Sequence, residues 1–136
     1  TGVLVNGAKK KKPLHPLFVM NLGGLDIICG RSTRETECHI GNRWFRTLVC
    51  LYKDSYQREA SRPAIKTTVV NTLLQEIERR GGRFVERKIL GKDGTTLKPY
   101  RKLTDRKEGE KVVYVLVQSM GVIEEKVRKA LRRKTK

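Results

Sequence analysis

Apolar residues recur at helical spacing in three segments of the chain, about 42–56, 63–80 and 122–133. In the first segment the apolar positions are Phe45, Leu48, Val49, Tyr52 and Tyr56. The second segment is the clearest, because Pro63 suits a first helical turn and Gly81 suits a C-terminal stop. Stripes of this kind are typical of amphipathic helices. The pattern therefore predicts three helices, each with one buried face.

Two further segments, 83–90 and 111–118, have the pattern of β-strands, and the charged segment 91–110 between them is loop-like. The short apolar run 25–29 is either a strand or a buried loop. This order predicts an α+β fold class: a small helix-turn-helix or winged-helix-like domain with two helices, a long-tipped β-hairpin and a C-terminal helix. The last helix follows the hairpin, which departs from the usual winged-helix order.

A polar, basic loop follows the apolar run 25–29 and leads directly into the first helix. The loop carries Arg31 and Arg34, and Asn42 is predicted to cap the helix by accepting a bond from an unpaired backbone N–H. A helix N-terminus presents exposed N–H groups and partial positive charge. The loop and the helix start together therefore predict a place that holds a phosphate.

Four short motifs occur in order: Cys29-Gly30-Arg31, His39-Ile40-Gly41-Asn42, Phe45-Arg46 and Gly81-Gly82-Arg83-Phe84. Together they resemble a domain family abundant in diatoms and related algae, whose pattern is Cys-Gly-Arg-Gly, His-x-Gly-Asn, Phe-Arg and Gly-Gly-Arg-Phe. The resemblance covers about residues 25–133, and Ser32 stands where the family usually has glycine. It implies two helices, a variable hairpin, a last helix, an algal source and a nuclear location. It implies no reaction.

The formal net charge of +17 changes the picture most, because it strongly favours a polyanionic partner. Solubility is a poor explanation of this charge, since acidic residues serve solubility better. A membrane surface is disfavoured, because no basic amphipathic helix has an aromatic face clear of the core. Nucleic acid is therefore the predicted partner, with duplex DNA favoured and RNA as the alternative.

The length of 136 residues is that of one domain. Residues 1–16 are predicted to be a basic flexible arm with a lysine run at 9–12, whose role is a nucleic-acid arm, part of a nuclear-import signal or a solvated tail. Residues 17–133 are predicted to form a single nucleic-acid-binding-type domain, and 134–136 a basic tail. The chain begins at a threonine and can be a fragment of a longer protein.

Three cysteines and one histidine have the right chemistry for zinc but the wrong spacing. Cys29, Cys38, His39 and Cys50 lack the short intervals of zinc knuckles, so neither a metal nor a cofactor is predicted. Cys29 and Cys50 are predicted to be small buried residues. His39 is predicted to bond locally at the helix start or to touch a phosphate. The odd cysteine count argues for a reducing compartment rather than a secreted disulfide framework.

Catalytic chemistry is weakly represented. Asp26, Glu35 and Glu37 are the only carboxylates near the basic loop that could serve a metal-dependent nuclease. Cys38 and His39 are adjacent in sequence, so their side chains diverge and do not make an activated nucleophile. The sequence therefore predicts a binding protein and not an enzyme.

The leading hypothesis is a nuclear DNA-binding module, with transcription regulation as a candidate role. An RNA-binding or ribonucleoprotein component is the second hypothesis, and a nuclease or an adaptor for an acidic protein follows. Trp44 is either a core residue or a stacking platform. The predicted nucleic-acid-binding residues are Arg31, Arg34, His39, Asn42, Arg43, Arg46, Arg83, Lys98, Arg101, Lys102, Arg128 and Arg132.

Overall fold

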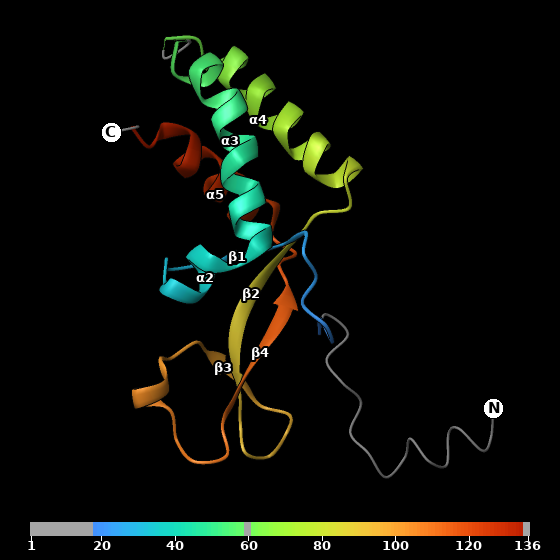
Figure 1. The fold of residues 1–136 in the computed structure, drawn as a ribbon, viewed down its shortest axis with the longest axis vertical. Coiled ribbons are helices and arrows are strands. Elements are labelled where there is room, and N and C mark those ends of the chain that lie inside the picture. Colours follow the sequence, from blue (N-terminus) through green and yellow to red (C-terminus); the bar gives the residue numbers. More distant parts are fainter. Residues whose placement is uncertain (1–17, 59–60, 135–136) are drawn as a thin grey trace, which may run out of the picture.

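The computed structural model describes residues 18–58 and 61–134 (Figure 1). In chain order the elements are β1 (Asp26–Cys29), α2 (Arg34–Cys38), α3 (Ile40–Arg58), α4 (Pro63–Arg79), β2 (Arg83–Leu90), β3 (Leu97–Pro99), the 3-10 helix η1 (Leu103–Asp105), β4 (Lys111–Leu116) and α5 (Met120–Arg132). Four α-helices and a four-stranded sheet in the described part confirm the α+β fold class. The predicted arm 1–16 and the last two residues of the predicted tail lie outside the described residues.

Strand β2 is the centre of the sheet. It runs parallel to β1, with Asp26 opposite Arg83. It runs antiparallel to β4 over residues 85–90 and antiparallel to β3 over residues 88–90. Because a strand has two edges, β1 and β3 share the edge of β2 that faces away from β4. The predicted hairpin is therefore present as β2 and β4, and its long tip contains β3 and η1.

Helices α2, α3 and α4 connect β1 to its parallel neighbour β2. A parallel pair needs a crossover of this kind, because a tight turn joins only antiparallel strands. Figure 1 shows α3, α4 and α5 gathered at one end of the molecule, while the hairpin of β2 and β4 extends toward the other end. The helix-turn-helix or winged-helix arrangement is not confirmed, since α3 and α4 belong to a crossover within the sheet and α5 packs against α3.

The sheet buries apolar residues on both faces. Neighbouring residues of a strand point to opposite faces. Ile27 accordingly packs with the buried residues of α3, α4 and α5, whereas Ile28 packs with Val19 and Val85 in a smaller cluster. Trp44 is partly buried against the main core, which confirms its interpretation as a core residue. The helices thus cover one face of the sheet, and the segment around Val19 covers part of the other.

Several predicted helix boundaries are confirmed. Helix α4 begins at Pro63, and Gly81 follows its end with a φ of +85°, a conformation that glycine adopts without strain. Helix α5 begins at Met120, two residues before the predicted segment, and Ser119 caps it by accepting a hydrogen bond from the Val122 N–H at 3.3 Å. The apolar stripe of α5 is confirmed as well, since Val127 and Leu131 are fully buried.

The prediction that Asn42 caps the first helix is wrong. Helix α3 begins two residues earlier, at Ile40, and the Asn42 side chain is buried. Its Oδ1 accepts a hydrogen bond from the Ile28 N–H at 2.7 Å, and its Nδ2 donates to the Ile28 carbonyl oxygen at 3.0 Å. Asn42 therefore pairs with the free edge of β1 as another strand would. The prediction that Cys50 is buried is also wrong, because Cys50 lies on the exposed side of α3.

Helix α2 was not predicted, because a five-residue helix is too short to show a hydrophobic period. Thr33 caps it, and the Thr36 hydroxyl returns the interaction by accepting from the Thr33 N–H at 2.8 Å. The region between Gly30 and α3 is therefore an ordered turn and a short helix. This local order fixes the direction in which Arg31 leaves the end of β1.

Candidate nucleic-acid interface

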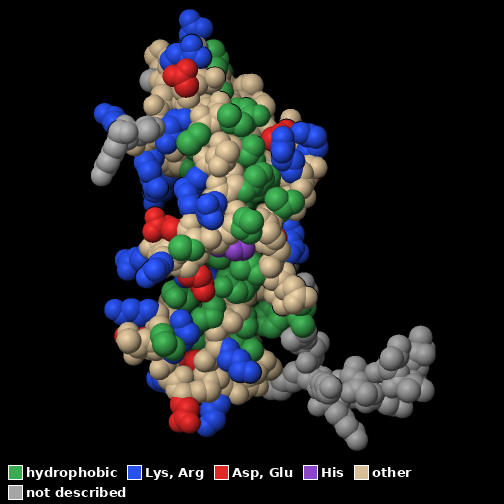
Figure 2. Space-filling model, in the orientation of Figure 1, with side chains coloured by type: hydrophobic (Ala, Val, Ile, Leu, Met, Phe, Trp, Pro, Cys, Tyr) green, Lys and Arg blue, Asp and Glu red, His purple; other side chains and the backbone are tan. Residues whose placement is uncertain are grey.

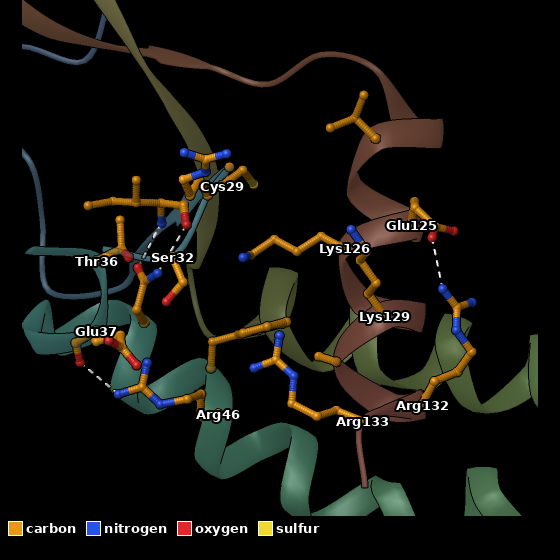
Figure 3. Close-up of a pocket in the computed structure, with 17 residues that line it drawn as sticks. Cys29, Ser32, Thr36, Glu37, Arg46, Glu125, Lys126, Lys129, Arg132 and Arg133 are labelled. Atoms are coloured by element: carbon orange, nitrogen blue, oxygen red, sulfur yellow. Dashed lines mark hydrogen bonds and ion pairs between the residues drawn. The ribbon is translucent and has the colours of Figure 1, made fainter. Parts of the chain in front are cut away.

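A hollow of about 800 Å³ lies at the carboxyl end of β1. Cys29, Asn42 and Phe45 contribute to its floor, the turn after β1 and helix α2 form one wall, and α5 forms the opposite wall (Figure 3). Its ionic side chains are Arg31, Arg46, Lys126, Lys129, Arg132, Arg133, Glu37 and Glu125. Six of these eight side chains are cationic, and we call this hollow the basic groove.

Two of the six cations already have partners that line the groove. Arg46 donates to the Glu37 carbonyl oxygen at 2.7 Å, and Arg132 lies 2.9 Å from the Glu125 carboxylate. Within residues 18–58 and 61–134, the side chains of Arg31, Lys129 and Arg133 have no ion pair or hydrogen bond. Figure 2 shows Lys and Arg side chains gathered along the edge where Figure 1 places α2 and α5.

Lys126 points into the groove. It extends from α5 toward Cys29 (Figure 3), and its Nζ lies 5.4 Å from the centroid of the Phe45 ring. Burial lowers the pKa of Lys126 and raises the pKa of the Cys29 thiol to about 11. Cys29 is therefore a neutral thiol at physiological pH and a poor nucleophile. The chemistry that the groove offers is electrostatic binding of an anion.

A second hollow, of about 700 Å³, adjoins the groove and reaches the base of the hairpin tip. We call it the tip hollow. Both hollows are lined by Cys29, Gly30, Arg31 and Val122. The further ionic and aromatic lining residues of the tip hollow are Arg87, Lys88, Arg101, Lys102, Glu86, Asp105 and Tyr100, so cations outnumber carboxylates in it. Arg31 therefore stands at the junction of two basic hollows.

Arg87 holds the turn after β1 and the start of α2 in place through hydrogen bonds. Its guanidinium donates to the Arg31 carbonyl oxygen, to the Thr33 hydroxyl and to Glu35, at 3.1, 3.1 and 3.2 Å. It also stacks on the Tyr100 ring, 4.1 Å from the centroid. Sequence reasoning missed Arg87. The signal that could have found it is an arginine at an inward-facing position of a strand, between the buried Val85 and Ile89.

The predicted residues fall into distinct groups. Arg31, Arg46 and Arg132 come together in the basic groove, and Arg101 and Lys102 line the tip hollow. Arg34 and Arg43 are exposed but line neither hollow. Arg128 lies outside both hollows, and its guanidinium is 3.4 Å from the Thr67 hydroxyl.

Other predicted residues serve the fold. His39 was predicted to bond locally at the helix start or to touch a phosphate, but it bonds to strand β1 instead, with Nε2 2.7 Å from the Asp26 carbonyl oxygen. Arg83 forms two hydrogen bonds with the Asp26 carboxylate, at 2.8 and 2.9 Å. Burial would raise the pKa of Asp26, but the bonds from Arg83 and from the Gly23 N–H hold that pKa below its usual value. Asp26 is thus committed to the contact between β1 and β2.

Glu110 neutralises part of the predicted hairpin tip. Its carboxylate accepts from Lys98 at 3.1 Å, from Arg101 at 2.7 Å and from the Lys107 N–H at 2.7 Å. These bonds, with the backbone bond from Lys107 first among them, lower the pKa of Glu110 to about 2. The tip therefore offers less free charge than its lysines and arginines suggest.

The sequence pointed to α5 but not to the residues that line the groove. Arg128 and Arg132 were predicted, whereas Lys126, Lys129 and Arg133 line it together with Arg132. A usable signal was present in the helical period, because positions 126, 129 and 133 are three and four residues apart and share one face. The buried residues Val127 and Leu131 decide which face of α5 lines the groove, and the apolar stripe of the sequence had already indicated that these two residues are buried.

Two further findings concern the described residues as a whole. No described helix has both the length and the apolar character that crossing a bilayer requires. In the same ranges, no group of three or more His, Cys, Asp or Glu side chains is placed to hold a metal ion.

A protein-family model with the description "Domain of unknown function (DUF6824)" matches residues 26–133. The chain belongs to this family. The DUF6824 match begins at β1 and ends just after α5, so it includes every element that forms the two hollows. Comparison with curated proteins and with solved structures gave no match.

Proposed function

We propose that the protein is a DNA-binding module of the nucleus that holds backbone phosphates in the basic groove. The observation that carries this proposal is the set of uncommitted cations, Arg31, Lys129 and Arg133, which face one hollow from two opposite walls. Like charges brought together repel each other unless an anion lies between them. Nucleic acid supplies such anions at regular intervals, and the net charge of +17 favours its approach.

Regulation of transcription is the role we propose for such a module. The motif resemblance supports a nuclear location and an algal source, and both belong to this proposal. The protein's arginines suit DNA because a guanidinium can form two bonds to a guanine edge, whereas a lysine reads mainly charge.

RNA binding as a ribonucleoprotein component is the second candidate. The low aromatic share of 6% favours it, because a scaffold needs charge more than base stacking. Preference for structured RNA over DNA of equal length, together with copurification with large particles, would place the protein in this class.

The test is a fluorescence-anisotropy titration of the protein with DNA and structured RNA at two salt concentrations. The groove variant Lys129→Ala/Arg133→Ala removes two charges from the groove, and the control variant Arg34→Ala/Arg43→Ala removes two exposed charges outside both hollows. On duplex DNA we expect the groove variant to flatten the log–log salt dependence by about 1.8, since each phosphate contact contributes about 0.9. The control variant should leave the slope within error.

Equal losses in the two variants would show that the charge acts generically, and the groove proposal would fail. Absence of binding to every nucleic acid would remove the function altogether and would favour an adaptor for an acidic protein. Site selection on the preferred nucleic acid then separates a sequence reader from a general binder, because enrichment of a motif requires base contacts.

A further inference from the structure

We infer that the basic groove and the tip hollow form one continuous track for a single nucleic-acid strand, which passes Arg31 between α5 and the hairpin tip. This inference rests on the proposed function and specifies the form of its ligand. It differs from the duplex preference expected from the sequence. A winged-helix arrangement, which would present a helix to a duplex groove, is not confirmed by the observed topology.

The two hollows adjoin each other. They share the lining residues Cys29, Gly30 and Arg31 of the turn after β1 and Val122 of α5, so a ligand that leaves one hollow at these residues enters the other. Cations occur along the whole length, from Arg133 and Lys129 in the groove, through Arg31 at the junction, to Lys102 in the tip hollow. A chain of regularly spaced phosphates matches this distribution better than one isolated anion does.

The concave shape of the site favours a single strand. A duplex reader inserts a protruding helix or β-ribbon into a groove that is about 12 Å wide. Here the free cations line a hollow between α2 and α5, and Lys126 reaches into it rather than outward (Figure 3). The rigid outer surface of a duplex follows a concave track between two walls less closely than a flexible single strand does, so a duplex should reach fewer of its cations. Proteins that bind single strands use positively charged grooves of this kind.

The bases of a single strand need apolar partners, because they are unpaired. Val122 is half exposed at the junction, and Met120 beside it at the start of α5 is also exposed. Tyr100 lines the tip hollow, but the guanidinium groups of Arg87 and Arg106 lie 4.1 and 5.6 Å from its ring centroid. Few ring faces are therefore free for stacking. Binding should depend on the backbone, with little preference among base sequences.

The test measures the affinity of the protein for a 12-nucleotide oligothymidine, a mixed-sequence single strand of the same length and the matching duplex. We expect both single strands to bind at least tenfold more tightly than the duplex, with affinities within about threefold of each other. The groove variant Lys129→Ala/Arg133→Ala and the separate variant Lys102→Ala should each weaken single-strand binding at least threefold. The control variant Arg34→Ala/Arg43→Ala should change it less than twofold.

A second measurement maps the path directly. Single strands that carry 5-iodouracil at each position in turn are cross-linked to the protein by light, and the cross-linked peptides are identified by mass spectrometry. We expect cross-links in the two segments 29–31 and 120–122 and at Tyr100. Duplex binding that equals or exceeds single-strand binding, or cross-links confined to other segments, would overturn the track while leaving the proposed function intact. Absence of binding to all three ligands would instead refute the proposed function.

Discussion

Replacing Asn42 by alanine tests the interpretation that this residue completes the edge of β1. The buried side chain forms one hydrogen bond to the Ile28 N–H and one to the Ile28 carbonyl oxygen. Alanine would leave both backbone groups buried without these partners, at a cost of about 1–3 kcal/mol for each group. Alanine also has a higher helix propensity than asparagine, and this offsets the loss of stability by about 0.5 kcal/mol. We therefore expect a net loss of about 3 kcal/mol in the free energy of unfolding.

Urea unfolding followed by Trp44 fluorescence and far-ultraviolet circular dichroism measures this loss. With a urea dependence of about 1.5 kcal/mol per M, the midpoint should fall by roughly 2 M while the dependence itself stays unchanged. The matched control is Asn71→Ala, because Asn71 is exposed on helix α4. This control should be neutral or stabilising by about 0.5 kcal/mol. A loss below 1 kcal/mol for Asn42→Ala would refute the reasoning, since it would mean that the β1 edge does not depend on the Asn42 amide.

Three further predictions concern the framework around the groove. A Cβ at Gly41 would lie 1.9 Å from the Asp26 carbonyl oxygen, so Gly41→Ala should lower the free energy of unfolding by about 3 kcal/mol or more in the same urea assay. The control Gly121→Ala, near the start of α5, should be tolerated, because the atom nearest to its Cβ would be 3.7 Å away. Asp26→Asn should cost about 1–2 kcal/mol at pH 7, because asparagine pairs more weakly with Arg83. Since the pKa of Asp26 is lowered in the folded protein, its contribution to stability is complete above the ordinary carboxyl pKa, shrinks as the pH falls below about 4 and disappears below the folded pKa. An undiminished stability difference between the two proteins at pH 3 would contradict this. Glu110→Gln should loosen the hairpin tip, and amide hydrogen exchange over residues 91–109 should become faster. In the natural protein these amides should stay protected down to about pH 2–3, because the pKa of Glu110 is about 2. Equal exchange rates in the two proteins would refute the role of this carboxylate.

Much of the fold could be predicted because its main elements carry strong local signals. Helix α4 has a proline at its start, a regular apolar stripe and a glycine after its end, and the structure places it within one residue of the predicted bounds. Strands β2 and β4 have enough consecutive strand-forming residues to be recognised without any partner. In each case the interactions that define the element lie within a few residues of one another.

The pairing of β1 could not be predicted in the same way. Its four residues carry too little pattern to distinguish a strand from a buried loop, and its partner β2 begins 57 positions later, at Arg83 opposite Asp26. The sequence alone also led to the wrong role for Asn42, a helix cap, because the strand that its amide contacts could not be placed. An asparagine near a helix start has that role in most local contexts, and only the arrival of β1 beside α3 gives its amide another partner.

The candidate site shows the same division. The sequence by itself determined that the protein is strongly cationic, that the turn after Cys29 is basic and that the second half of the last helix is basic. Only the tertiary structure decided that this turn and α5 face each other across one hollow, and that Arg31 and Lys129 line it while Arg34 and Arg128 do not. Charge is a sum over residues and can be read from composition. A groove depends on which side of each helix is buried and on contacts between segments about 95 residues apart, and these are set by packing of the whole core.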